Sequence, residues 1–188
     1  VRAFRIMTEK AGEMRLSAHL SIANSIDKSV QKLSQGLSWL PLAMAALTVF
    51  VVVLRYGFGL GAISAQEGVV YLHSALFMLG ASCTLLADEH VRVDVFYRNF
   101  SLRSKAWVNA LGHTMFTLPL CTLIVFSSLG YVGESWSIRE VSPEPGGIPA
   151  VYILKTLIPL MAILLALQAV GEIFKSVHIL IEQEPNRG

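Results

Sequence analysis

The residues best able to do chemistry stand in LLADEHVRVDVFYRNF, residues 85–100, where an apolar run gives way to alternating valines and charges. On a helix, His90 and Asp94 would lie one turn apart, which suits a general base and the carboxylate that orients it. Neither a Ser or Cys nucleophile nor a set of metal ligands accompanies them, and catalysis needs a complete constellation. We therefore expect no enzyme. The pair has a structural or partner-binding role, or its charges serve only as a topology signal.

Two histidines inside apolar segments suggest a second kind of chemistry. His73 and His113 could be the axial ligands of a haem in the membrane anchor of a respiratory enzyme. At 1.5 Å per residue, however, their depths in the membrane differ by roughly 10 Å, which is awkward for two ligands of one iron. A buried imidazole hydrogen-bonded between helices is the simpler interpretation of each. A haem-binding or structural anchor is kept as the alternative function, and we expect no cofactor.

The composition is that of an integral membrane protein. Hydrophobic residues make up 54% of the 188-residue chain and charged residues 15%, whereas soluble domains carry roughly 25% charged residues. The net charge of +2 is too small, and the basic residues too scattered, to indicate nucleic-acid binding. Cys83 and Cys121 lie in apolar runs and are typical of small buried hydrophobes. We expect no cleaved signal peptide, because no short apolar core with a cleavage site follows the first basic residues.

Four apolar segments are long enough to cross a ~30 Å hydrocarbon core, and they must be helical because lipid offers no water to an unbonded backbone. They are predicted at about 37–57, 65–87, 106–130 and 150–174. Pro119 and Pro159 fall inside the third and fourth spans and are predicted to kink them. The predicted fold is therefore an all-α membrane domain over residues 37–175, followed by a cytoplasmic tail over 176–188.

The distribution of Lys and Arg predicts which side each loop faces. Six of these residues precede the first span and four lie in the 88–105 loop, whereas the 55–64 and 134–149 loops have one each. Cytoplasmic loops carry the excess of positive charge, so we expect both termini and the 88–105 loop in the cytoplasm. The two other loops would then be periplasmic.

An amphipathic helix is predicted over residues 17–36, after a disordered tail over residues 1–16. Apolar residues recur at helical spacing and polar residues, Asp27 among them, occupy the opposite face. The pattern is typical of a helix that lies in the membrane interface, and we expect the chain to bend into the membrane near Gly36. A helix packed on the rest of the protein is the less favoured interpretation, because the chain has no soluble domain for it to cover.

Residues 90–100 are predicted to form a short in-plane helix rather than a strand. A lone strand at a membrane surface has nothing to pair with. As a helix, the segment places Asp94 one turn from Arg98 and gathers one apolar face. That face consists of Val93, Phe96, Tyr97 and Phe100. The arginines of the loop would hold it among anionic headgroups.

In this setting HVRVD, residues 90–94 with Arg92 at its centre, resembles the signature of the small permease subunit of TRAP (tripartite ATP-independent periplasmic) transporters. Further features occur in a similar order: RYGFG (55–59) with Arg55, Glu67 opening the second span, ESW (134–136) with Trp136, EVSPEPGG (140–147) with Glu140, and the Lys155/Pro159 pair. The resemblance covers about residues 25–175.

The resemblance implies a division of labour among three proteins. A periplasmic solute-binding protein captures an organic acid or a related solute and delivers it to a large permease subunit. The large subunit carries substrate and sodium. The small subunit associates with it in the bacterial inner membrane and enlarges the stationary scaffold, so its expected partners are those two proteins and membrane lipid.

The residues by themselves agree with a supporting role. The first three spans have no charged residue in their middle thirds, and Lys155 lies near the outer end of the fourth. A coupled transporter needs polar sites at mid-membrane, so this chain is not expected to transport unaided. Lys155 either snorkels to the headgroups or pairs with Glu67 from the same side. The residues expected at a partner interface or in a structural contact are Arg55, Glu67, His90, Arg92, Asp94, Trp136, Glu140 and Lys155.

Overall fold

The computed structural model describes the backbone of residues 2–87 and 100–182, and the side chains from residue 19 onward within those ranges. The described residues form helices and turns and contain no strand, which confirms the all-α prediction. The elements are α1 (Arg2–Leu37), α2 (Leu40–Gly57), α3 (Ile63–Leu86), α5 (Leu102–Gly112), the π-helical turn η1 (His113–Thr117), α6 (Leu118–Ser137) and α7 (Val151–Glu182).

The prediction of four membrane-spanning helices is also confirmed. Four stretches are long and apolar enough to cross a membrane: His19–Gly57, Ile63–Leu86, Leu102–Ser137 and Val151–Glu182. The third joins α5, η1 and α6 into one continuous helix, and the fourth is α7 alone. The third extends beyond its predicted limits at both ends and the fourth at its C-terminal end. A helix can continue past the lipid wherever its residues still favour it.

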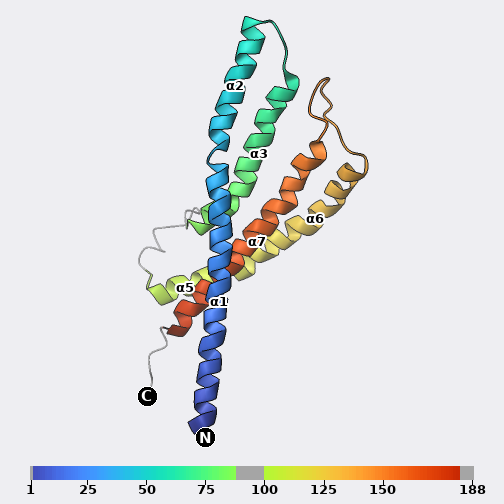
Figure 1. Cartoon of the computed structure of the whole chain (residues 1–188). Coiled ribbons are helices and arrows are strands. Elements are labelled where there is room, and N and C mark those ends of the chain that lie inside the picture. The colour runs from blue at the N-terminus through green and yellow to red at the C-terminus, as the bar shows by residue number, and fades with distance from the viewer. Residues whose placement is uncertain (1, 88–99, 183–188) are drawn as a thin grey trace.

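Helix α7 lies at the centre of the arrangement. It contacts α1, α3, α5, η1 and α6, whereas α2 packs on α3 (Figure 1). The α2–α3 loop and the α6–α7 loop lie toward the same end of the molecule, which we call the loop end. The start of α1 and the last turns of α7 lie toward the other end, which we call the terminal end.

Helix α1 differs from its prediction in extent and in surroundings. It begins at Arg2, so the residues expected to be a disordered tail are helical. It ends near the predicted bend at Gly36, with a break at Ser38 and Trp39. Pro41 follows in the first turn of α2, a position that needs no amide hydrogen. Beyond the break, α2 continues in nearly the same direction as α1 (Figure 1).

Part of the apolar face of α1 is covered by protein. Ala23, Val30 and Leu37 recur every seven residues and are 0%, 4% and 8% exposed, and α1 packs on both α7 and α3. This stretch therefore packs on the rest of the protein, which the sequence made the less favoured interpretation. Helices α3 and α7 provide the apolar surface that it packs on.

The regular helix of the third span is interrupted just before Pro119. Proline lacks an amide hydrogen and its ring crowds the carbonyl one turn earlier, so a helix must widen or bend there. Here the chain widens into η1, where His113 Nδ1 lies 3.2 Å from Thr117 Oγ1. Pro159, by contrast, is buried within α7, which remains a single helix through it.

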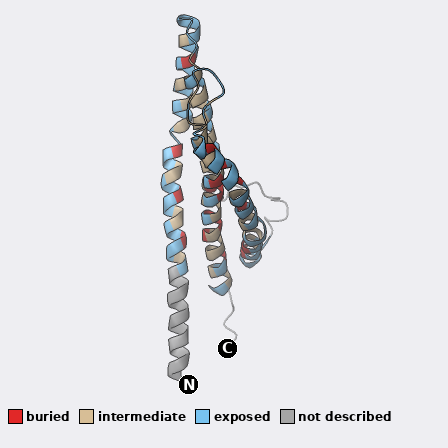
Figure 2. Ribbon diagram, turned by 90° about the vertical axis from the view of Figure 1, so that its right-hand side faces the viewer, coloured by how far each residue is buried: buried red, intermediate tan, exposed pale blue. Residues whose placement is uncertain are grey.

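Few residues of the described bundle are buried, and they are scattered along its helices (Figure 2). The largest that are fully buried are Gln168, Cys121, Ser82 and Ser135, whereas Phe77, Phe116 and Phe126 are each more than 70% exposed. Helices that face lipid or another membrane protein typically have small residues at helix contacts and large apolar residues on the outside. The described surface therefore suits contact with lipid or with another membrane protein.

The close approach of α2 and α3 yields a prediction at Gly68. A Cβ atom at Gly68 would lie 3.1 Å from Leu47 Cδ2, whereas one at Gly80, on the same helix, would meet nothing within 4 Å. Gly68→Val should lower the free energy of unfolding by about 1–3 kcal/mol because it overpacks this contact. Thermal unfolding of the purified protein in detergent would measure the change, with Gly80→Val as the matched control. Equal losses in the two variants would contradict the prediction.

Candidate functional site: polar contacts at the two ends of the bundle

Glu67 connects the start of α3 to the α6–α7 loop at the loop end. One carboxylate oxygen of Glu67 accepts a hydrogen bond from the Ser142 hydroxyl, and the other accepts one from the backbone amide of Ile148 at 2.5 Å. The amide of Ser142 donates to the carbonyl of Ile148 at 3.3 Å and so closes the loop on itself. Gly147 makes room for this arrangement, since a Cβ there would lie 2.7 Å from Glu67 Oε1.

Lys155 pairs with Glu140 in the same region. Its ammonium nitrogen lies 2.5 Å from Glu140 Oε2 and 4.0 Å from the centre of the Tyr131 ring. The amide of Val151 donates to the carbonyl of Glu140 at 3.1 Å, so the loop brings Glu140 next to the first turn of α7. We call Glu67, Glu140, Ser142, Ile148 and Lys155 the loop-end clasp.

The clasp replaces both interpretations of Lys155 made from the sequence. Lys155 neither snorkels freely nor pairs with Glu67, because Glu140 is closer along the chain and the loop backbone already satisfies Glu67. The hydrogen bond from Lys155 is the main cause that holds the pKa of Glu140 below its ordinary value of 4.5. Glu140 is therefore anionic at neutral pH.

Trp136 is a structural contact between α6 and α7. Its indole nitrogen donates to Thr156 Oγ1 at 2.8 Å, and its ring lies 4.6 Å from the ring of Tyr152. Arg55, also predicted at an interface, is exposed in the last turn of α2 and forms no ion pair with any described residue.

The predicted 90–100 helix falls mostly outside the described residues, as do three of the expected interface residues. These are His90, Arg92 and Asp94. The structure therefore adds nothing to what the sequence predicts for that segment.

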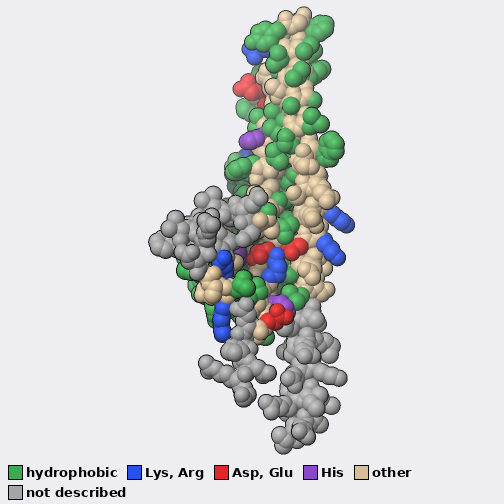
Figure 3. All heavy atoms as spheres, turned by 90° about the vertical axis from the view of Figure 1, so that its left-hand side faces the viewer, with side chains coloured by type: hydrophobic (Ala, Val, Ile, Leu, Met, Phe, Trp, Pro, Cys, Tyr) green, Lys and Arg blue, Asp and Glu red, His purple; other side chains and the backbone are tan. Residues whose placement is uncertain are grey.

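A second polar cluster joins α1 to α7 at the terminal end. Lys175 Nζ lies 3.1 Å from Asp27 Oδ2 and 2.5 Å from Glu172 Oε1. The Gln168 amide donates to Asp27 at 2.9 Å and to Glu172 at 3.1 Å, and Gln168 is fully buried. Acidic and basic side chains gather in this lower part of the molecule (Figure 3). We call these four residues the terminal-end clamp.

The terminal-end clamp was not predicted from the sequence. Asp27 was expected on the polar face of an interfacial helix, whereas it bonds to α7. A signal was nevertheless present, because Gln168, Glu172 and Lys175 are spaced four and three residues apart on one side of an otherwise apolar helix. Polar residues aligned in this way within a span usually face a partner.

The two histidines considered for haem each contact a neighbour on their own helix. The His73 ring lies 6.5 Å from that of Phe77, and His113 Nδ1 lies near Thr117 Oγ1. The described residues contain no group of three or more His, Cys, Asp and Glu that could hold a metal ion. The polar residues of the two clusters hold helices together through ion pairs and hydrogen bonds.

The clasp generates a prediction that separates the two possible partners of Lys155. In a double-mutant cycle, Lys155→Met and Glu140→Gln should be strongly non-additive, because each leaves the other charge without its partner in a poorly hydrated site. The matched cycle of Lys155→Met with Glu67→Gln should be closer to additive. Thermal unfolding in detergent would measure both cycles. Coupling of Lys155 to Glu67 as strong as to Glu140 would contradict the structure.

The same coupling should depend on pH. The pKa of Glu140 is lowered in the folded state, so its contribution to stability is complete above its ordinary value of 4.5 and is lost as pH falls through the folded-state pKa. The stability difference between the wild type and Glu140→Gln should therefore shrink on acidification below about 4.5. Glu144→Gln, an exposed residue of the same loop, is the control and should not show this pattern.

The chain matches the family model described as "Tripartite ATP-independent periplasmic transporters, DctQ component" over residues 44–178. Neither a curated protein nor a solved structure matches it. The match extends from α2 to the last turns of α7, so it includes the loop-end clasp and the α7 side of the terminal-end clamp. With more than half of the chain matched, and with four helices able to span a membrane, the protein belongs to the DctQ family, the small permease component of TRAP transporters.

Proposed function

We propose that this chain is the stationary scaffold subunit for the large permease subunit of a sodium-coupled TRAP transporter. The large subunit would move an organic acid or similar solute, which a periplasmic solute-binding protein delivers. The observation that carries this proposal is the family match over residues 44–178. The haem-anchor alternative is not proposed, because the match is to a transporter component.

The position of the polar groups supports a scaffold rather than a moving carrier. Lys155 of the clasp lies in the second turn of α7, Glu172 and Lys175 of the clamp lie in its last third, and both clusters tie that helix to its neighbours. A carrier of ions instead needs polar groups at mid-membrane, usually on broken helices. In this proposal the chain contributes rigidity and apolar surface, and the large subunit contributes the substrate and sodium sites.

We also propose that both termini are cytoplasmic and that the two loops of the loop end are periplasmic, in a bacterial inner membrane. The bias of Lys and Arg supports this orientation, with six such residues before the first span and one in the 55–64 loop. It would turn the loop-end clasp toward the periplasm, where the binding protein approaches.

Single cysteines test this orientation. Ser64→Cys and Glu144→Cys, both at exposed positions of the loop end, should react with an impermeant thiol reagent in whole cells. Ser101→Cys, exposed before α5, should react only after the membrane is permeabilised. The background would lack Cys83 and Cys121. Labelling of Ser101→Cys alone in whole cells would invert the orientation.

A second experiment tests the scaffold role itself. Uptake into proteoliposomes should require the large subunit and the binding protein, and this chain alone should show no sodium-driven uptake. Lys155→Met opens the clasp, so it should reduce the yield of assembled complex while leaving uptake per assembled complex near that of the wild type. Arg139→Gln, which removes an exposed charge of the same loop, is the control. Uptake by this chain alone, or a full yield with abolished uptake, would overturn the scaffold proposal.

A further inference from the structure

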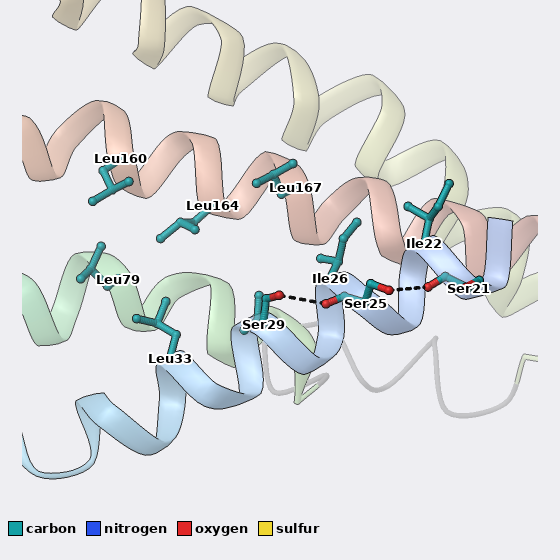
Figure 4. A pocket seen from close by; sticks show the side chains of 11 residues that line it. Ser21, Ile22, Ser25, Ile26, Ser29, Leu33, Leu79, Leu160, Leu164 and Leu167 are labelled. Atoms are coloured by element: carbon teal, nitrogen blue, oxygen red, sulfur yellow. Dashed lines mark hydrogen bonds between the residues drawn. The ribbon is translucent and has the colours of Figure 1, made fainter. Parts of the chain in front are cut away.

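An apolar groove of about 580 Å³ runs along α1 where it faces α3 and α7 (Figure 4). Leucines line one side, with Leu79 from α3 and Leu160, Leu164 and Leu167 from α7. The other side is α1 from Ser21 to Leu33, a rise of twelve residue steps and so roughly 18 Å. Pockets of this volume and apolar lining are typical of ligand sites.

The α1 side of the groove carries three serines among apolar side chains. Ser21, Ser25 and Ser29 follow one another at four-residue spacing along it. The Ser25 hydroxyl donates to the carbonyl of Ser21 at 2.9 Å, and the Ser29 hydroxyl to that of Ser25 at 3.0 Å (Figure 4). Because the hydroxyl groups of Ser25 and Ser29 donate within the helix, an alkyl chain can lie against this part of the wall without leaving those donors unbonded.

Two cations flank the serine row. Lys28 and Lys32 lie three residues beyond Ser25 and Ser29, so helical spacing places them beside those serines. Both are exposed, and neither forms an ion pair with a described residue. Asp27, the nearest carboxylate along α1, is instead bonded to Lys175 and Gln168 in the terminal-end clamp.

We propose that this groove binds an anionic phospholipid. One acyl chain lies in the groove between α1 and α7, and the phosphate lies against Lys28 and Lys32. Basic residues beside a cavity between membrane helices favour anionic headgroups. A partner helix fits less well, because its apolar face would cover two lysines and leave their charges unpaired. The lipid would stiffen the α1–α7 contact beside the clamp.

The headgroup part of the proposal is tested with the purified full-length chain in neutral detergent. Bound phosphatidylglycerol and phosphatidylcholine of identical acyl chains would be counted by native mass spectrometry during titration. We expect the anionic lipid to bind roughly tenfold more tightly or better. Lys28→Gln combined with Lys32→Gln should remove that preference. Arg103→Gln combined with Arg139→Gln, which removes two exposed charges elsewhere, should retain it.

The groove part is tested with a pair of substitutions at one position. Ser29→Phe fills the groove and should abolish binding of both lipids, whereas Ser29→Ala removes only the hydroxyl and should leave binding unchanged. Wild-type binding by the double lysine variant would overturn the headgroup site. Unchanged lipid binding by Ser29→Phe, with loss of co-purification of the large subunit, would assign the groove to a partner helix and overturn the proposal.

Discussion

Polar side chains in a helix bundle surrounded by lipid must find partners inside the protein, because the surrounding medium offers none. In the described chain, polar side chains of helix α7 find such partners on other parts of the protein. Near its first turn Lys155 binds Glu140, and toward its other end Gln168 and Lys175 bind Asp27. Between these points α7 presents small buried residues such as Ala162 and Ala169 to its neighbours. The other helices are arranged around a helix that is held at both ends.

The two clusters differ in what they hold. The loop-end clasp ties a loop to α3 and α7, and it depends on backbone groups such as the Ile148 amide as well as on side chains. The terminal-end clamp ties two helices and contains two carboxylates with one lysine. Removing Lys155 or Lys175 leaves a carboxylate without its cationic partner, which costs more than the intact contact contributes. Ion pairs and hydrogen bonds therefore fix the packing of the two clusters, whereas small buried side chains allow the close packing between them.

The position of α1 links this packing to the membrane. One side of α1 is held on α7 by Asp27 and by Ile26, which lies next to Gly171. The adjacent side carries the serine row and its two lysines over an open apolar groove. A helix that is fixed on one side and open on the next can bind a lipid without rearranging. The proposed scaffold role and the proposed lipid site would thus both depend on the same α1–α7 contact.

The amino-acid sequence by itself determined the four spans, the all-α class and the family resemblance, because hydropathy and segment length are local properties that lipid selects directly. It also picked out Glu67, Trp136, Glu140 and Lys155 as residues with partners. Only the tertiary structure decided which partners these are. Asp27 meets residues 141 and 148 positions away, and helical periodicity shows that a face is apolar without showing what covers it. The neighbours of each helix depend on the packing of the whole bundle, so the partner of Lys155 and the burial of α1 could not be derived from spacing along one chain.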